Sequence, residues 1–387
     1  MSIATCRMTD KPIRVGFLIQ NIGPSPSGVW TRLRDLVSAL MAEPKIELFA
    51  AVTNDAERQL LGLATDRTFS TSPMSSARRV FSTSRIARAF VEEFDLDLLQ
   101  VESMPIPHRA TVPLSVSLHD LREFDIPAWQ LRSLGELYRR VLLPRQARKV
   151  GAVLSLTAWM SHEIEHRLSI HNVHVVPPIA PKAVVPAGPS EQVARSANVD
   201  QPFVLTVGHL EPRKNIEVLI RASSGPEWPR GLGLVIAGAD HGSLARLSQM
   251  AATSPTPIAF LGPVSDADKW WLLERAAVVA VPSLIEGFGI VALEGILVGS
   301  PVLVADAAAL PEVVGDARAV LAPDDHEAWC RRIRDTVTDP LLQSSIVEKE
   351  SSILQRHTEA SVVANLLTIY QDLVGPALSL GAIRDPA

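Results

Sequence analysis

The stretch that decides the fold is residues 282–316, which read PSLIEGFGIVALEGILVGSPVLVADAAALPEVVGD. The apolar run AAVVAV at residues 276–281 precedes it and is typical of a strand buried on both faces of a parallel sheet. A glycine turn, GFG at residues 287–289, leads into a predicted helix over residues 289–298, and a second apolar strand follows. Strand, glycine turn, helix and strand in this order predict a parallel α/β domain.

The start of this helix is a candidate anion site. The N–H groups of Gly289, Ile290 and Val291 would lack partners within the helix, and such groups favour phosphate. Glu286 lies just before the turn and Glu294 lies in the first turns of the helix. Because a carboxylate accepts two hydrogen bonds from a vicinal diol, the pair could hold a sugar and a ribose on either side of a diphosphate. A solvated Glu that complements the helix dipole is the alternative for either residue alone.

Three segments together, EGFGIVALEG, GSPVLVA and LPEVVGD, resemble the C-terminal signature of the retaining, GT-B-fold glycosyltransferases. The family (glycosyltransferase family 4, group 1) includes sucrose synthases and bacterial mannosyltransferases, and the resemblance runs from about Arg14 to Asp325, with gaps in the N-terminal half. It implies an α/β protein of GT-B type, in which two Rossmann-like domains with parallel sheets face a cleft. In the family the first Glu contacts the donor sugar and the second the nucleotide ribose. These roles fall on Glu286 and Glu294.

A second segment points to the same chemistry. The predicted strand at residues 203–208 ends at Gly208, and HLEPRKN follows. Arg213 and Lys214 at the carboxyl end of a strand suit a diphosphate by charge pairing, although a surface charge run would look the same. The EPRKN segment resembles the one in which the family's Arg and Lys neutralise the donor phosphates. A second family Arg often follows the strand's glycine, and His209 stands at that place here.

The length of 387 residues suits two domains rather than one core. The resemblance implies an N-terminal acceptor domain over residues 1–180 and a donor domain over residues 203–359. The proline-rich stretch at residues 181–202 reads as the linker between them. A last helix, about residues 360–387, is expected to pack back on the first domain.

The N-terminal half carries two weaker signals. An apolar strand at residues 14–20, a loop with Gly28 and a helix at residues 29–41 form a nucleotide-fold opening, with a plain connecting loop as the alternative. The family usually has a Gly-Gly pair in this loop over the donor phosphate, and Gly28 is the glycine present here. The strand at residues 112–118 ends at His119, where ligands bind in open α/β sheets. In the family this His faces the donor sugar.

Other segments have more ordinary interpretations. Residues 66–76 are rich in Ser and Thr and are expected to form a loop, and helices are expected at residues 76–94 and 128–149. The first of these helices combines four Arg with apolar residues, which suits either a solvated helix or peripheral contact with a membrane. His162 and His166 are spaced i, i+4, but no nearby carboxylate completes a metal-binding pattern.

The segment LGPV at residues 261–264 resembles the family segment near the nucleotide base, which makes Gly262 a candidate. Trp270 and Trp271 follow it and are expected to pack in the core. The candidate catalytic residues are therefore His119, Glu286, Arg213 and Lys214. The candidate donor-binding residues are Gly28, Gly208, Arg213, Lys214, Gly262, Glu286, Gly287, Phe288, Gly289, Ile290, Val291 and Glu294.

The composition argues against several classes of partner and location. A net charge of −5 does not favour nucleic acid. Cys6 and Cys330 give no disulfide framework, and no apolar run reaches the roughly 18 residues of a membrane span. No signal-peptide pattern is seen at the N-terminus, so a cytoplasmic location is expected, with peripheral contact at the inner membrane face as an option.

The resemblance implies transfer of a hexose from a nucleotide diphosphate sugar to a hydroxyl of a saccharide or lipid-linked saccharide, as in bacterial polysaccharide or glycoconjugate assembly. A mannose-type sugar with GDP-mannose as donor is the leading expectation. No cofactor and no metal are expected, because no D-x-D pair follows a predicted strand. A non-catalytic nucleotide-sugar-binding protein and a GT-B nucleotide-sugar epimerase are the alternatives.

Overall fold

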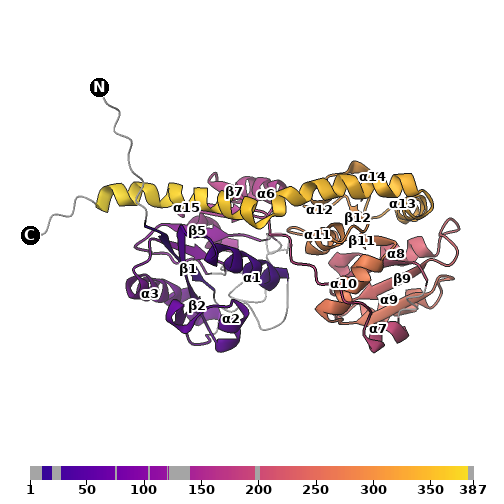
Figure 1. Ribbon diagram of the computed structural model, residues 1–387, viewed down its shortest axis with the longest axis horizontal. Helices are drawn as coiled ribbons and strands as arrows, with labels where there is room; N and C mark the ends of the chain where they lie inside the picture. The colour runs from indigo at the N-terminus through magenta and orange to yellow at the C-terminus, as the bar shows by residue number, and fades with distance from the viewer. Residues whose placement is uncertain are drawn as a thin grey trace, which may run out of the picture. The chain divides into compact units, whose positions relative to one another are not determined.

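The computed structural model describes residues 11–19, 28–74, 76–102, 105–119, 121, 140–196 and 201–381. The chain divides into two compact units (Figure 1). The first consists of Met1–Leu156, Ser161–Ile179 and Glu359–Ala387, and the second of Thr157–Met160 and Ala180–Thr358. Each unit is built on one parallel sheet, which confirms the expected α/β class.

The first unit has a seven-stranded sheet in the order β3-β2-β1-β4-β5-β6-β7. The strands are β1 (Ile13–Leu18), β2 (Ile46–Val52), β3 (Thr68–Ser70), β4 (Leu98–Val101), β5 (Leu114–Ser117), β6 (Ala152–Ser155) and β7 (Val173–Val175). The helices are α1 (Gly28–Met41), α2 (Asp55–Leu60), α3 (Ser76–Phe94), α5 (Leu143–Ala147) and most of α6 (Ala158–Leu168), with the C-terminal helix α15 (Glu359–Gly381) and the short 3₁₀ turn η1 (Thr65–Arg67). The central strands are almost fully apolar because both faces of the sheet are covered.

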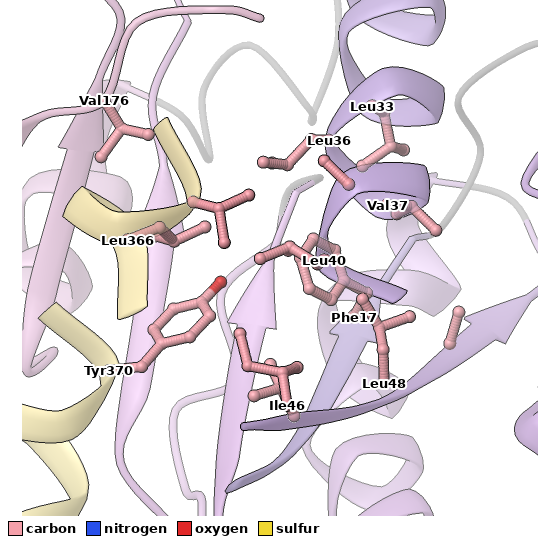
Figure 2. Close-up of a cluster of buried hydrophobic side chains, with 14 of the residues drawn as sticks. Phe17, Leu33, Leu36, Val37, Leu40, Ile46, Leu48, Val176, Leu366 and Tyr370 are labelled. Carbon is pink, nitrogen blue, oxygen red and sulfur yellow. The ribbon is translucent and has the colours of Figure 1, made fainter. Parts of the chain in front are cut away.

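The core of this unit joins the two ends of the chain. Figure 2 shows side chains of α1, β1 and β2 packed with Leu366 and Tyr370 of α15. Both of these α15 side chains are fully buried. The side-chain amide of Asn365 also donates a hydrogen bond to the carbonyl of Val175, at 2.8 Å. The C-terminal helix is therefore part of the first unit, although the whole second unit precedes it in the sequence.

The second unit has a six-stranded sheet in the order β10-β9-β8-β11-β12-β13. The strands are β8 (Phe203–Val207), β9 (Gly233–Ala237), β10 (Ile258–Gly262), β11 (Val278–Val281), β12 (Val302–Ala305) and β13 (Val320–Leu321). The helices are α7 (Glu191–Ser196), α8 (Ile216–Ser223), α9 (Leu244–Ala251), α10 (Asp266–Arg275), α11 (Ile290–Leu297), α12 (Leu310–Val314), α13 (His326–Thr338) and α14 (Pro340–Ser351). Its described residues also form the 3₁₀ turns η4 (Pro212–Lys214), η5 (Ala317–Ala319) and η6 (Ser352–His357).

Each sheet reverses its strand order at one point. In the first unit β1 lies beside β4, and in the second β8 lies beside β11. At such a switch point the loops leaving two neighbouring strands turn to opposite faces, which opens a crevice at the carboxyl ends. The loops after β8 and β11 are those that carry the candidate cations and the EGFG turn, so the strand order brings them together.

The structure departs from the sequence expectations in two segments. The stretch at residues 66–76, expected to be a loop, contains β3, which pairs with residues 50–52 of β2. Three residues at a sheet edge are too few to show an alternating apolar pattern. Within the expected linker at residues 181–202, Glu191–Ser196 form α7, and the N–H of Ser190 donates to the carboxylate of Asp268 at 2.7 Å. Most of the helix expected at residues 128–149 lies outside the described residues.

Candidate functional site

The EGFG turn after β11 ends at a helix start. Gly289 is the N-cap of α11 and has a φ of 99°, in the left-handed region. A Cβ built on it would lie 2.6 Å from Cδ2 of the buried Leu310, so both the conformation and the space require glycine. Ile290 and Val291 form the first turn of α11, where N–H groups have no acceptor within the helix. The predicted anion site therefore coincides with a helix start.

Two cations from the loop after β8 reach the glutamate of this turn. The Nζ of Lys214 donates to Oε1 of Glu286 at 2.5 Å, and Nη1 of Arg213 lies 3.7 Å from the same oxygen. Arg213 also pairs with Glu211 at 2.7 Å. These side chains are only partly exposed, between 15% and 30%. The structure thus brings together three of the four candidate catalytic residues, of which Lys214 and Glu286 are 72 positions apart in the sequence.

Backbone contacts hold the two loops against each other. The N–H of Leu284 donates to the carbonyl of Arg213 at 2.8 Å, and Nη1 of Arg213 donates to the carbonyl of Ile285 at 3.2 Å. Asn215 has a φ of 51°, and its side-chain amide donates to the carbonyls of Pro282 and Pro323. Asn tolerates the left-handed region better than most residues and can bridge carbonyls at the same time. The final Asn of EPRKN therefore braces the loop that presents Arg213 and Lys214.

The second glutamate of the pair has a partner that the sequence reading missed. The Glu294 side chain is 3% exposed, and Nζ of Lys269 donates to its Oε1 at 2.6 Å. Lys269 lies on α10 and also stacks its ammonium over the ring of Trp270, 5.1 Å from the centroid. Trp270 and Trp271 are buried, as expected of packing residues. A lone Lys on a helix gives no local signal, so only the packing of α10 on α11 identifies it.

The remaining candidates of the second unit surround this arrangement. Gly208 has a φ of 151°, and a Cβ there would lie 3.2 Å from Cε of Lys214, so glycine leaves room for that side chain. Gly262 ends β10 with a φ of 66°. Gly287 is half-buried in the turn. The Phe288 ring is buried and packs edge-on against His357, with ring centroids 5.5 Å apart, so we expect only its backbone to reach a ligand.

His209, at the place where the family often has Arg, stacks on His241. The two rings are nearly parallel, with centroids 4.0 Å apart. Burial lowers the pKa of His209, and the neighbouring His241, Lys214 and Arg213 lower it further, while Glu211 opposes them. The ring is therefore mostly neutral at neutral pH and adds little positive charge beside the two cations.

The two N-terminal candidates, Gly28 and His119, belong to the first unit. Gly28 is the first residue of α1, and residues 20–27, which were predicted to form a loop, lie outside the described residues. His119 follows β5, and its Nε2 lies 3.5 Å from Oε2 of the buried Glu102. The next residue, Asp120, lies outside the described residues. Sequence reading missed Glu102, although a carboxylate directly after a buried strand was a usable signal.

Among the described residues, no group of three or more His, Cys, Asp or Glu side chains is placed to hold a metal ion. His162 and His166 stack with centroids 6.1 Å apart. Within the same described part of the chain, no helix has the length and apolar character to span a membrane.

The second unit contains the segment that matches a known family. Residues 190–352 match the family model described as "Glycosyl transferases group 1". This range includes Arg213, Lys214, Glu286 and Glu294. The chain therefore carries a group 1 glycosyl transferase domain, as the sequence resemblance indicated.

Several curated proteins are similar to the chain over longer stretches. The D-inositol 3-phosphate glycosyltransferase of Acidothermus cellulolyticus is 29% identical over 280 residues, which cover 67% of this chain and 62% of the relative. The protein of the same name from Mycolicibacterium smegmatis is 29% identical over 66% of this chain and 57% of its own length. The O-antigen chain mannosyltransferase B of Escherichia coli is 35% identical over 143 residues, 36% of this chain and 38% of the relative. The matched part spans less than two thirds of each of these relatives.

Solved structures establish the fold over nearly the whole chain. HepE of Anabaena, solved in complex with UDP and glucose, gives a TM-score of 0.71 at 18% identity and covers 93% of this chain and 100% of its own. The sucrose-phosphate synthase of Thermosynechococcus elongatus gives a TM-score of 0.71 at 16% identity, covering 94% and 100%. At these identities the likeness concerns the fold alone, and the GT-B prediction is confirmed.

Proposed function

From the premise that residues 190–352 are a group 1 glycosyl transferase domain, we propose that the protein transfers a hexose from a nucleotide diphosphate sugar to a hydroxyl group, with retention at the anomeric carbon. The acceptor is a saccharide or a lipid-linked saccharide. GDP-mannose is the leading donor, and the similarity to an O-antigen mannosyltransferase supports that choice. The observation that carries the proposal is the contact of Arg213 and Lys214 with Glu286 beside the start of α11.

The chemical task of such a transfer is to stabilise the charge that builds up on the departing diphosphate. Preorganised donors do this best, because they need not reorient during the reaction. Arg213 and Lys214 are held in place by the loop contacts described above, and the first-turn N–H groups of α11 add a second source of positive potential. These groups neutralise a leaving diphosphate without requiring a metal ion.

Glu286 suits a sugar-orienting role better than a nucleophilic one. Its Oε1 accepts a hydrogen bond from Lys214 and lies close to Arg213, and two cations withdraw electron density from the oxygen. A carboxylate held in this way still accepts hydrogen bonds from sugar hydroxyls. On this proposal Glu286 binds the hexose, and Glu294, fixed by Lys269, binds the ribose.

The sequence alternative with structural support is a protein that binds a nucleotide sugar without transferring it. His209 stands where the family often has an Arg beside the two cations Arg213 and Lys214, and its lowered pKa leaves the ring mostly neutral at neutral pH. With less positive charge at this place, the protein would stabilise a leaving diphosphate less. Turnover, and not binding, therefore separates the two functions.

The experiment is a thermal-shift titration with GDP-, UDP-, ADP- and dTDP-sugars on the wild type and on Lys214→Ala and Glu294→Ala. Arg246→Ala is the matched control, because Arg246 pairs with Glu217 at an exposed site. A donor at about 100 times its dissociation constant stabilises the fold by about 2.7 kcal/mol. We expect one nucleotide sugar to stabilise the wild type and the control, but neither site variant.

Turnover follows with the stabilising donor and a mixed saccharide pool. Release of the nucleoside diphosphate together with a product of unchanged anomeric configuration, read by NMR, supports a retaining transferase. An inverted product would contradict retention. Binding without release under all acceptors would favour the non-catalytic alternative, and no stabilisation by any nucleotide sugar would overturn both.

We also propose peripheral membrane contact through α3. Phe81 is 84% exposed on this helix, and Arg78, Arg85 and Arg88 are exposed near it. An aromatic residue among cations suits the surface of an anionic membrane. Sedimentation with vesicles that contain anionic lipid should capture the wild type, and capture of Phe81→Ser should be weaker. Equal capture by purely zwitterionic vesicles, or none at all, would refute this contact.

A further inference from the structure

A buried polar cluster lies at the carboxyl end of the sheet in the first unit. Its members come from α1, the strands β4 and β5 with the residues that follow them, and α15. They are Arg32, Gln100, Glu102, Ser117, His119 and Tyr370. We call this group the Glu102 cluster. It includes a candidate catalytic residue, His119, and one of its hydrogen bonds joins Gln100 to Tyr370, 270 positions apart in the sequence.

Glu102 is the centre of the cluster. Its Oε1 accepts hydrogen bonds from the Ser117 hydroxyl at 2.8 Å and from Nε2 of Gln100 at 2.9 Å. Its Oε2 accepts one from Nη1 of Arg32 at 3.0 Å and lies 3.5 Å from Nε2 of His119. The side chains of Glu102 and Arg32 are 1% and 3% exposed, so water contributes little to either.

The charge state of this carboxyl follows from its surroundings. Burial is the largest single influence and would raise the pKa of Glu102, but the Arg32 charge, His119 and the Ser117 hydroxyl together outweigh it and lower the pKa to about 2. Glu102 is therefore ionised across the physiological range. An ionised carboxylate only accepts hydrogen bonds. Nε2 of His119 lies 3.5 Å from Oε2 of Glu102 and has no hydrogen-bond partner among the described residues, so a proton on this nitrogen is what prevents two acceptors from facing each other.

We propose that Glu102 is the positioning residue of His119: its carboxylate selects the imidazole tautomer with the proton on Nε2 and leaves Nδ1 as the acceptor. In neutral imidazole one nitrogen donates and the other accepts, so fixing one determines the other. The part played by Nδ1 rests on the proposed function and on the family resemblance, which implies that His119 faces the donor sugar. There Nδ1 accepts a hydrogen bond from a sugar hydroxyl.

The far side of the cluster fixes Glu102 in turn. The Tyr370 hydroxyl donates to Oε1 of Gln100 at 3.2 Å, which turns the amide so that its Nε2 points at Glu102. Burial raises the pKa of Tyr370 well above its usual value, and the negative charge of Glu102 raises it further, so this hydroxyl remains a donor. The C-terminal helix thereby supports the orientation of His119 through two intervening side chains.

Stability alone is a weak reason for such a cluster. A buried ion pair loses hydration that its mutual attraction only partly recovers, and apolar residues of similar volume often serve a fold as well. Replacing both charges together is therefore compatible with folding, whereas removing one leaves the other buried without its partner. The double variant Arg32→Met/Glu102→Leu is the test, and Arg14→Met/Glu47→Leu, which removes a half-exposed pair in the same unit, is its control.

The first measurement needs no donor sugar. The wild type is labelled with ¹⁵N-histidine, and His119 is assigned among the ten histidines by the signal lost in His119→Asn. Long-range ¹H–¹⁵N correlation distinguishes the protonated ring nitrogen from the bare one. We expect Nε2–H for His119 in the wild type and the control, and a mixture of tautomers in the double variant. A wild-type His119 protonated on Nδ1 alone would overturn the proposal.

The second measurement separates positioning from folding. Outer groups that orient a functional group typically contribute roughly ten- to hundredfold in activity at metal sites. We expect the double variant to lose about tenfold in kcat in the wild-type background and less than about twofold in the His119→Asn background. Equal losses in both backgrounds would assign the cluster a purely structural role. If transfer activity is absent altogether, the proposed function fails, and the tautomer measurement still decides the role of Glu102.

Discussion

Replacing Glu350 by glutamine should stabilise the second unit at neutral and alkaline pH. Glu350 lies on α14 and is fully buried. One of its oxygens, Oε2, accepts a hydrogen bond from the N–H of Val302 at 3.2 Å, and Oε1 has no hydrogen-bond partner in the described part of the chain. Burial raises the pKa of Glu350 to about 9, with a smaller contribution from Asp316, although the Val302 N–H opposes it.

The magnitude follows from proton linkage. The ordinary pKa of this carboxyl is 4.5, so above pH 4.5 the unfolded chain releases a proton that the folded chain retains. The stabilising contribution is complete below pH 4.5 and is lost as the pH rises toward the folded value of about 9. Above pH 4.5 the free energy of unfolding falls by about 1.4 kcal/mol for each pH unit, so it has fallen by about 4 kcal/mol at about pH 7.5. Glutamine cannot ionise and still offers an oxygen to Val302, so it should avoid this loss.

Urea unfolding at about pH 5, 6.5 and 8 measures the effect. The fluorescence of Trp228, Trp270, Trp271 and Trp329 reports on the second unit, which contains all four. Glu348→Gln is the control, because Glu348 is exposed on the same helix. The free energy of unfolding of Glu350→Gln, relative to the wild type, should increase with pH. The same difference for the control should not change with pH. An advantage that does not change with pH would refute the reasoning.

Three further predictions concern the loops of the candidate site. His209→Arg should tighten binding of a nucleoside diphosphate about tenfold at neutral pH, because it restores a cation. The pKa of His209 is lowered, so binding to the wild type should tighten below about pH 6.5, as His209 protonates. Calorimetry on His209→Gln should not show this pH dependence. Asn215→Gly should lower the free energy of unfolding by about 1–2 kcal/mol, because two side-chain hydrogen bonds are lost. Asn215→Ala should lower it by about 1 kcal/mol more, because alanine is strained at the φ of 51° and glycine is not. Equal losses in the two variants would contradict backbone strain at this position. Gly289→Ala should lower Tm and abolish the donor-induced thermal shift, because its Cβ meets Leu310; an unchanged shift would argue against a binding role for this turn.

Local patterns predicted most of the elements well. The helix expected at residues 76–94 is α3, and the helix expected at residues 289–298 is α11, shortened at each end. Thr157 directly precedes α6, and its hydroxyl accepts a hydrogen bond from the N–H of Met160, as an N-cap residue does. Such features depend on hydrogen bonds between residues a few positions apart, which the sequence displays directly. The short strand β3 and the helix α7 were not predicted, because each depends on a partner from another part of the chain.

The sequence by itself determined the kind of site: a glycine turn at a helix start, two glutamates and two cations at strand ends, in an order that resembles one glycosyltransferase family. Only the tertiary structure decided which of these groups meet. The pairing of β8 with β11 places Lys214 against Glu286, and the packing of α10 on α11 gives Glu294 its lysine. Likewise, only the return of the C-terminal helix brings Tyr370 to the cluster around Glu102. The physical reason is that strand order and helix packing follow from burying apolar surface over the whole domain, and no local pattern records which distant residues that burial brings together.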